Sequence, residues 1–578
     1  MRSDNKTSYS SELFREYASP RGMSLTGRRC ADKRFRYLQN MYIDYEGGGN
    51  GVESIPGYRK IHAAKDRIHS LAIQQVGRDK FIIIHEGGSL YRLGCSTDGG
   101  SKIADISDCD SNAFVFGENC LIADGSGLYL IDGEGKFTPL CHESYIAECS
   151  CFALFDGRLF LSGSRSHRGK IFYSSRLDGG DVVFSQDNFI FGGGDIISLL
   201  SHRGRLWVFR SAEGGRGVIT CHKADEGYPI CLSLGGVRPV GQVLSLEDKI
   251  LLLAADGLWA IENTSEEEKT GLSHRSAEIE PMLTREDIYT AKLCLWKGYA
   301  VIGCGERIYL GDRRGSDKEY GWYFLAGIGS HSGDRRVYRY SDTAPEGYFA
   351  HRSAHAPAES EVISLTREDG EAIFYTEEGG KKYSVYPTDE RWGGNLLPAE
   401  NLLSDGELLC FTTDEGIFLF NSDMRGTPPE RLRSSDDFNE KEYERLYGRV
   451  IHPDFYSFDG HAPSYIIATE YDDCGLPLTE KTSVGRSLFL RVKAPRGTPL
   501  TVSVLTDGKT ASIQRLIAPP HNDRQYEWEC PTGLISLTER ANGWVEKQIV
   551  IESREFASPF GLCSLAFKYQ PKEKLKKG

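Results

Sequence analysis

The sequence lacks several residue patterns that mark well-known catalytic and metal sites. Its 15 cysteines include no CxxC pair, and the CxC at Cys149 and Cys151 has no second pair to complete a zinc site. There is no GxSxG nucleophile elbow and no HExxH metal motif. We therefore expect buried free thiols, no metal, no cofactor and no catalytic centre, so the chain is not expected to be an enzyme.

Long apolar runs and excess positive charge are also missing. The longest apolar run, Ile250–Ala255, is too short to span a bilayer, and no apolar core of signal-peptide length follows the N-terminus. The formal net charge is −13, which gives no general affinity for nucleic-acid backbone. The one basic cluster is the tail at Lys572–Lys577. We expect a protein made in a reducing cytoplasm that contacts no membrane and has no specific DNA site.

What the sequence has is a repeated β-hairpin. An apolar strand, a short polar or glycine turn and a second strand with an aromatic residue near its start recur at roughly 40 to 50 residues, the period of a four-stranded propeller blade. The copies are Phe81–Leu93, Cys120–Ile131, Arg158–Tyr173, Arg205–Thr220, Ile250–Ile261, Ala300–Leu310, Val362–Tyr375 and Leu408–Leu419. Tight turns such as Asp256-Gly257 and Asp414-Glu415-Gly416 suit hairpins.

The repeat predicts an all-β fold, a seven- or eight-bladed β-propeller followed by a small β-sandwich domain. The expected divisions are an N-terminal extension (1–34), the propeller (35–433), a charged linker (434–463), the C-terminal β-sandwich (464–570) and the basic tail (571–578). A pair of plain β-sandwiches is the alternative to the propeller. Helical patterns are nearly absent, and the one short helix expected covers Ser11–Tyr17, where Ser19-Pro20 would end it.

The segment from Tyr37 to Ile61, here called the lead-in segment, precedes the first repeat and is rich in glycine. Its triple glycine, Gly47, Gly48 and Gly49, is followed by Asn50-Gly51-Val52-Glu53 and not by the Gly-Lys-Ser/Thr of a phosphate loop. No βαβ unit surrounds it, which argues against a dinucleotide site. Asn40 and Pro56-Gly57 are expected to fix turns, and the glycines are expected to form a flexible loop that contacts a neighbouring subunit. The structural or assembly candidates of this segment are Asn40, Tyr42, Gly47, Gly48, Gly49, Pro56 and Gly57.

Some propellers are glycosidases, so the carboxylates and histidines must be considered as candidate catalytic or metal-binding residues. Ser96–Gly100 is similar to the Asp-box turn of sialidase-like propellers, but that turn is structural, and no spacing singles out the arginine trio or the nucleophile of a sialidase. The acidic stretches Asp105–Asp110 and Glu470–Asp473 offer oxygen ligands for calcium but lack the EF-hand glycine and closing glutamate, which favours solvated loops. The histidine pairs His62/His69 and His351/His355 lack a placed glutamate.

The order of the lead-in segment resembles that of one family of phage proteins. Tyr37-Leu38-Gln39-Asn40-Met41-Tyr42 is followed by a glycine loop over 46–50 and then by Ile55-Pro56-Gly57. This order is similar to the first segment of the tail hub or nozzle proteins of short-tailed phages, also called packaged-DNA stabilisation proteins. Further similarities lie in strands that end in glycine or serine and in the C-terminal region: Gly157–Gly163, Ile171–Ser175, Ser245–Ile261, Trp544–Lys547 and Ser558–Gly561.

The resemblance implies a virion structural protein of the portal-proximal tail, synthesised in the cytoplasm of a bacterial host. Its copies would form a homo-oligomeric ring, a hexamer in such proteins, that contacts other tail or portal-adaptor proteins, retains packaged DNA and passes it at ejection without binding it specifically. An acidic surface suits such a conduit, because a basic lining would hold phosphate. Two alternatives remain open at this stage: a receptor- or glycan-binding propeller of a phage tail, and a sialidase-like glycosidase.

Overall fold

The structure is a computed structural model of the chain, whose 578 residues divide into two compact units. The propeller unit comprises 59–320 and 398–420, and the composite unit comprises 1–58, 321–397 and 421–578. The structure describes residues 13–18, 22–23, 35–43, 51–95, 100–177, 181–211, 217–223, 230–234, 237–262, 271–283, 288–305, 307–314, 320–327, 335–341, 343–350, 362–366, 372–378, 380–392, 397, 400–421, 453–494, 498–517, 532–539, 541–554 and 559–572.

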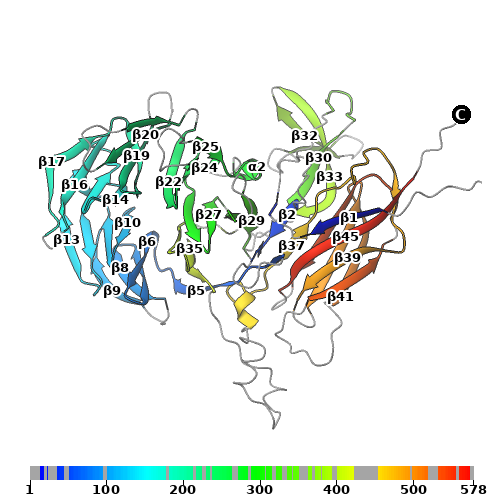
Figure 1. Cartoon of the computed structure of the whole chain (residues 1–578), viewed down its shortest axis with the longest axis horizontal. Helices are drawn as coiled ribbons and strands as arrows, with labels where there is room; N and C mark the ends of the chain where they lie inside the picture. Colours follow the sequence, from blue (N-terminus) through cyan, green and yellow to red (C-terminus); the bar gives the residue numbers. More distant parts are fainter. Residues whose placement is uncertain are drawn as a thin grey trace, which may run out of the picture. The chain divides into compact units, whose positions relative to one another are not determined.

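Within its described residues the propeller unit contains seven antiparallel sheets, the blades (Figure 1). Blade one is β6 (Ile68–Val76), β7 (Asp79–Glu86), β8 (Ser89–Gly94) and β9 (Gly100–Asp105). Blade two is β10 (Asn112–Phe116), β11 (Asn119–Ala123), β12 (Leu128–Ile131) and β13 (Phe137–Cys141). Blade three is β14 (Cys151–Phe155), β15 (Arg158–Ser162), β16 (Lys170–Arg176) and β17 (Phe184–Phe191). Blade four is β18 (Asp195–His202), β19 (Arg205–Ser211), β20 (Gly217–Lys223) and β21 (Ile230–Ser233).

The remaining blades complete the ring. Blade five is β22 (Pro239–Leu246), β23 (Lys249–Ala254), β24 (Gly257–Glu262) and β25 (Gly271–His274). Blade six contributes β26 (Lys292–Trp296), β27 (Tyr299–Cys304) and β28 (Arg307–Asp312) to this unit. Blade seven has the order β34 (Leu402–Ser404), β35 (Leu409–Thr413), β36 (Gly416–Phe420) and β5 (Tyr58–Ala63), so its outermost strand comes from the lead-in segment. The first strands contact one another between blades one and two and from blade three through to blade seven, and β34 meets β6 to close the ring.

Local sequence explains the hairpins of these blades. Asp156 and Gly157, between β14 and β15, have φ angles of 46° and 65°, the positive pair that a tight two-residue hairpin turn requires. Arg203 and Gly204 repeat this between β18 and β19, with φ angles of 51° and 69°. The turn at Asp256 joins β23 to β24, as the sequence predicted.

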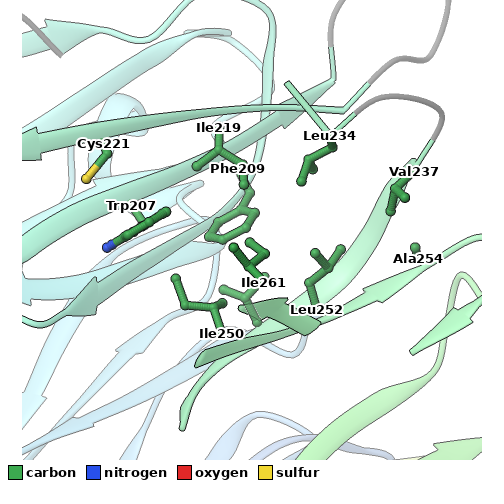
Figure 2. Packing of buried hydrophobic residues seen from close by; sticks show 11 residues of the cluster. Trp207, Phe209, Ile219, Cys221, Leu234, Val237, Ile250, Leu252, Ala254 and Ile261 are labelled. Carbon is green, nitrogen blue, oxygen red and sulfur yellow. The ribbon is translucent and has the colours of Figure 1, made fainter. Parts of the chain in front are cut away.

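The core of the propeller lies between blades, because each sheet buries apolar side chains against the next. Figure 2 shows the cluster between blades four and five, in which Trp207 and Phe209 of one blade lie near Ile250, Leu252 and Ile261 of the other. Similar clusters join blades one to two, two to three, three to four and seven to one. This confirms the predicted propeller, with seven blades among the described residues.

The described part of the composite unit contains two larger sheets and one smaller sheet. The first has the order β3 (Met41–Tyr42), β4 (Val52–Ser54), β45 (Gly561–Pro571), β38 (Lys481–Thr482) and β43 (Asn542–Trp544), and β45 also pairs with β1 (Leu13–Ala18) and β39 (Arg486–Lys493), which pairs in turn with β42 (Thr532–Thr538). The second runs β29 (Gly321–Leu325), β2 (Tyr37–Gln39), β37 (Tyr465–Ala468), β44 (Lys547–Ser553), β40 (Pro499–Thr506) and β41 (Lys509–Ile517). The third is β30 (Arg335–Tyr340), β33 (Lys381–Trp392), β32 (Ala372–Glu378) and β31 (Ile363–Thr366).

Helices are short. The described residues contain α1 (Ser144–Ala147), α2 (Glu280–Leu283) and one 3₁₀ turn, Pro453–Tyr456. None of the described helices has the length and apolarity needed to cross a membrane.

Two expectations from the sequence require correction. The helix expected over Ser11–Tyr17 is instead strand β1 from Leu13, because its backbone pairs with β45 in the register Leu13↔Tyr569. The division at 35–433 also differs from the observed one, since β2 to β4 and the sheet β30–β33 lie in the composite unit. The hairpin at Val362–Tyr375, counted above with the blade repeats, is therefore outside the propeller; isolated hairpins look alike in sequence whichever sheet they join. Residues 464–570 contribute to both larger sheets; the one with β45 also takes in β1 from the expected N-terminal extension, and β45 runs to Pro571 at the start of the expected tail.

Candidate functional site

Asn40 lies near the start of the lead-in segment, in the turn between β2 and β3. It is fully buried, and its φ angle of 55° falls in the left-handed region, which asparagine tolerates better than most residues. Its side-chain Nδ2 donates to the carbonyl oxygen of Ser464 at 2.9 Å, and its Oδ1 accepts from the backbone N–H of Ala326 at 2.9 Å. Asn40 thereby joins three segments of the composite unit that are far apart in sequence.

The backbone of Asn40 extends the same joint. Its N–H donates to the carbonyl of Phe324, and its carbonyl accepts from the N–H of Ile55. Tyr42, only 5% exposed, follows on β3 and pairs with Glu53 of β4. Because Ile55 directly precedes Pro56, the fold brings both ends of the lead-in segment together.

Gly57 passes very close to another backbone segment. A Cβ atom on Gly57 would lie 1.8 Å from the carbonyl oxygen of Ser457, so no other residue fits without a backbone shift. Its N–H donates to Phe455 at 2.7 Å, and its carbonyl accepts from Asn421 at 2.8 Å. The glycine is needed for this close crossing, and Pro56 before it is buried.

The structure thus brings together Asn40, Tyr42 and Pro56-Gly57 within the composite unit. Gly47, Gly48 and Gly49 lie outside the described residues, so contact of that loop with a neighbouring subunit stays a prediction. Ser96–Asp98 of the Asp-box-like turn, His351 and His355 also lie outside the described residues.

Sequence reasoning missed a buried ion pair in the composite unit. Lys547 of β44 and Glu539, just after β42, both have fully buried side chains, and Lys547 Nζ lies 2.8 Å from Glu539 Oε1. Lys547 also donates to Ser483 Oγ at 2.7 Å and lies 4.2 Å from the ring centroid of Trp544. Burial lowers the pKa of Lys547, while the carboxylate of Glu539 opposes that shift.

This pair connects the two larger sheets. Lys547 belongs to the second sheet, whereas Phe567, whose ring centroid lies 5.0 Å from Lys547 Nζ, belongs to β45 of the first. Side chains of one sheet therefore face the other, as in the predicted sandwich. The only signal in the sequence is a lysine two residues before the apolar run Ile549–Ile551, which does not reveal its partner.

A second polar joint holds the N-terminal strand. Arg15 Nε and the hydroxyl of Tyr17 both donate to Oδ2 of Asp472, each at 2.5 Å. Burial, followed by the nearby Asp472 carboxylate, raises the pKa of Tyr17 well above its ordinary value. One carboxylate of the acidic stretch 470–473, considered above for calcium, therefore accepts hydrogen bonds from β1.

Histidines of the propeller unit are also engaged in structural contacts. His62 Nε2 lies 3.0 Å from Glu86 Oε2, and His69 Nε2 lies 2.8 Å from Asp108 Oδ1. His85 Nδ1 lies 2.7 Å from Ser111 Oγ, and burial lowers the pKa of His85, which favours the neutral ring. These contacts run between blades one and two and between blades seven and one.

The thiols and acidic groups form no recognisable reaction centre among the residues described. Within that part of the chain, no three or more His, Cys, Asp or Glu side chains are placed to hold a metal ion. The cysteines whose side chains are described are free thiols. Burial raises the pKa of Cys120 to about 12, which leaves that thiol protonated and unreactive at neutral pH.

Comparison with known proteins adds little to this account. No protein-family model and no curated protein matches the sequence. Among solved structures, the AfRom2 CNH domain is 10% identical and covers 58% of this chain and all of its own, with a TM-score of 0.34. The WD40 domain of SCAP from fission yeast is 11% identical over 63% of this chain and 94% of its own, with a TM-score of 0.34. Virginiamycin B lyase from Staphylococcus aureus is 10% identical over 63% of this chain and 98% of its own, with a TM-score of 0.33. Scores this low carry no argument, so the propeller assignment rests on the blades themselves.

Proposed function

We propose that this chain is a structural protein of a phage virion, located in the portal-proximal tail as a hub or nozzle. Its copies form a ring that retains packaged DNA and passes it at ejection. The observation that carries the proposal is the joint at Asn40. The residues whose order resembles the phage family are the ones that tie distant segments into the composite unit, so that order has a structural reason to persist.

Rigidity supports this role. The seven blades bury apolar clusters between one another, so the propeller resists bending without one large core. A part of the portal vertex under the pressure of packaged DNA needs such stiffness. A net charge of −13 gives the ring a surface that repels phosphate and lets DNA move through.

Ring formation requires heterologous contacts, in which one face of a copy meets a different face of the next. The loop at 47–49 is our candidate for such a contact, because it follows the anchored turn at Asn40. Partners beyond the ring are portal-adaptor and other tail proteins.

A phage that carries an amber mutation in this gene tests the proposal. Particles grown without suppression are expected to package DNA and then lose it, which DNA content per capsid measures after centrifugation. Complementation with the wild-type gene restores retention, and complementation with a Gly57→Ala gene restores it only in part. Full DNA retention in the mutant particles contradicts the proposal.

The two alternatives give different results in the same particles. A receptor- or glycan-binding protein leaves mutant particles full of DNA but unable to adsorb, and the purified chain then binds bacterial cell-wall glycan in a pull-down. A glycosidase releases product from a panel of aryl glycosides. A tail hub or nozzle copurifies with the portal complex and does neither.

A further inference from the structure

The composite unit holds two lysine–glutamate pairs that are similar in length but differ in exposure. Lys493 Nζ lies 3.0 Å from Glu53 Oε2, and these side chains are 35% and 22% exposed. Lys547 Nζ lies 2.8 Å from Glu539 Oε1, and both of these side chains are 0% exposed. Water solvates the first pair as ions, whereas the second pair has lost that solvation, so its ionic form is much more costly.

Aromatic rings exclude water from the buried pair. Lys547 Nζ lies 4.2 Å from the ring centroid of Trp544 and 5.0 Å from that of Phe567, and both rings are buried. In such surroundings the proton of the ammonium group can move to the carboxylate, because a neutral amine and a neutral carboxylic acid need less solvation than two ions. A neutral amine is a nucleophile, whereas an ammonium group is not.

The lysine nitrogen faces the carboxyl carbon of its partner. Lys547 Nζ lies 2.8 Å from Oε1 and 2.9 Å from Oε2 of Glu539. The carboxyl carbon lies between these two oxygens, so the nearly equal distances place it within about 3.5 Å of the nitrogen, the separation of a near-attack arrangement. The two groups are therefore positioned to react with each other.

Two buried serines complete the arrangement. Ser483 Oγ accepts hydrogen bonds from Lys547 Nζ at 2.7 Å and from Trp544 Nε1 at 3.3 Å. Its single proton is thereby directed to Glu539 Oε1, to which it donates at 3.0 Å. Ser487 Oγ donates to Oε2 at 3.4 Å. Ser483 can pass a proton from the nitrogen to Oε1, and Ser487 can stabilise negative charge that develops on Oε2.

We propose that Lys547 and Glu539 condense to an amide that covalently joins β44 to the end of β42. The proton of the ammonium group first moves to Oε1. The electron pair of Nζ then forms a bond to the carboxyl carbon, and the bond from that carbon to Oε1 breaks. Oε1 leaves as water with a second proton from Ser483, which takes a proton from Nζ in return. The products are one amide and one water molecule, and no group is oxidised or reduced.

The amide links the two larger sheets, because β44 belongs to the second sheet and Glu539 directly follows β42 of the first. The joined residues are 8 positions apart, and a cross-link that closes a short loop removes less entropy from the unfolded chain than one that closes a long loop. Variants without Lys547 lack the bond whether or not Glu539 is also replaced, so a difference between them reports the unpaired carboxylate alone. This inference goes beyond the proposed function and does not depend on it.

Mass spectrometry of the full-length protein, unfolded before the measurement, tests the proposal. We expect the wild-type chain to weigh one water molecule less than its sequence requires. Trypsin should no longer cut after Lys547, so peptides 525–540 and 541–554 should appear as one joined species. Fragmentation of that species should place the link between Lys547 and Glu539. In the same digest trypsin should cut after Lys493, because its more exposed pair stays ionic.

Four variants separate the parts of the proposal, and circular dichroism shows that each has folded. Lys547→Arg keeps the positive charge, but a guanidinium group stays protonated and does not attack, so the loss of water should disappear. Glu539→Gln should abolish it too, because condensation of a glutamine releases ammonia. Ser483→Ala should slow cross-linking by about 100-fold in samples taken during cell-free synthesis, because the proton relay is lost. The matched control, Lys493→Arg, should keep the loss of water.

Several results overturn the proposal. A wild-type chain with the full mass of its sequence, from which trypsin releases peptide 541–547, has an ionic pair and no amide. A loss of water that maps to an Asp-Gly sequence such as Asp132-Gly133 is a cyclised aspartate and contradicts the assignment. A loss of water that persists in Lys547→Arg does the same, and an unchanged rate in Ser483→Ala removes the serine from the reaction.

Discussion

In the propeller unit, apart from β5 in blade seven, a strand pairs with a strand close to it in the chain, as Cys120 of β11 does with Ile131 of β12. In the composite unit the pairs are remote: Leu13 of β1 lies opposite Tyr569 of β45, and Tyr37 of β2 opposite Ala468 of β37. Closing a long chain segment costs entropy before any contact forms. The composite unit joins such remote segments through buried polar contacts as well as apolar side chains, whereas the propeller blades pack mainly through apolar clusters between local hairpins. Changes at these contacts test the distinction.

The largest effect is expected at the buried pair of the composite unit. Lys547→Met leaves the carboxylate of Glu539 buried without its partner, which costs about 3–5 kcal/mol of unfolding free energy. Hydrogen exchange should accelerate in β37, β44 and β45 and stay unchanged in blades one to five. The double variant Lys547→Met/Glu539→Leu should regain most of the loss. Unchanged exchange in the single variant would contradict a buried pair.

The matching change in the propeller removes apolar volume. Leu252→Ala opens a cavity in the cluster between blades four and five, where Leu252 is fully buried, at a cost of about 2–5 kcal/mol. Exchange should accelerate in β19, β23 and β24 and stay unchanged in the composite unit. Leu272→Ala, at a 37% exposed side chain of the same blade, should change little. Equal acceleration in both units would show that they do not unfold separately.

Gly57→Ala tests the close crossing in the lead-in segment. The added methyl collides with the carbonyl of Ser457, and the backbone shift should cost about 1–3 kcal/mol in chemical denaturation of the composite unit. The control is Gly271→Ala, because nothing lies within 4 Å of the added carbon there. Identical denaturation midpoints for the two variants would rule out the crossing.

The smallest expected effect is a pH dependence of the contacts between Glu86 and the chain around β5, the strand that closes the propeller. Burial alone would raise the pKa of Glu86, but hydrogen bonds from the backbone of Lys65 and from His62 of β5 lower it below its ordinary 4.5. A carboxyl group whose pKa is lower in the folded state than in the unfolded state stabilises the fold at pH values above its unfolded pKa. That contribution is lost as the pH falls through the folded pKa.

Protection of the Lys65 and Asp66 amides should therefore drop by about 1–2 kcal/mol as the pH falls well below 4.5, after correction for intrinsic exchange. Glu86→Gln should abolish this pH dependence. Glu415→Gln should retain it, because the Glu415 side chain is 66% exposed and its pair with Lys60 contributes little. A flat profile in the wild type would contradict the assignment.

The difference between the units also explains which parts of the fold can be predicted from the sequence. Alternating residues and Asp-Gly turns lie within one hairpin, so the blades around Phe160 and Leu252 follow from local pattern. The remote pairing of β1 does not, and the segment that ends at Tyr17, expected to be a capped helix, carries no local sign of its partner β45. Asn40 is recognisable as a turn residue, whereas its bond to Ser464 depends on a partner 424 positions away. The closing strand β5 is likewise hidden, since its partner β36 lies near the other end of the propeller.

Cryo-electron microscopy of purified virions tests the central claim most directly. The account predicts density for the seven-bladed propeller in a ring below the portal, with the channel for DNA at its centre. Density for this chain only at the tip of a fibre or in the capsid shell would contradict it.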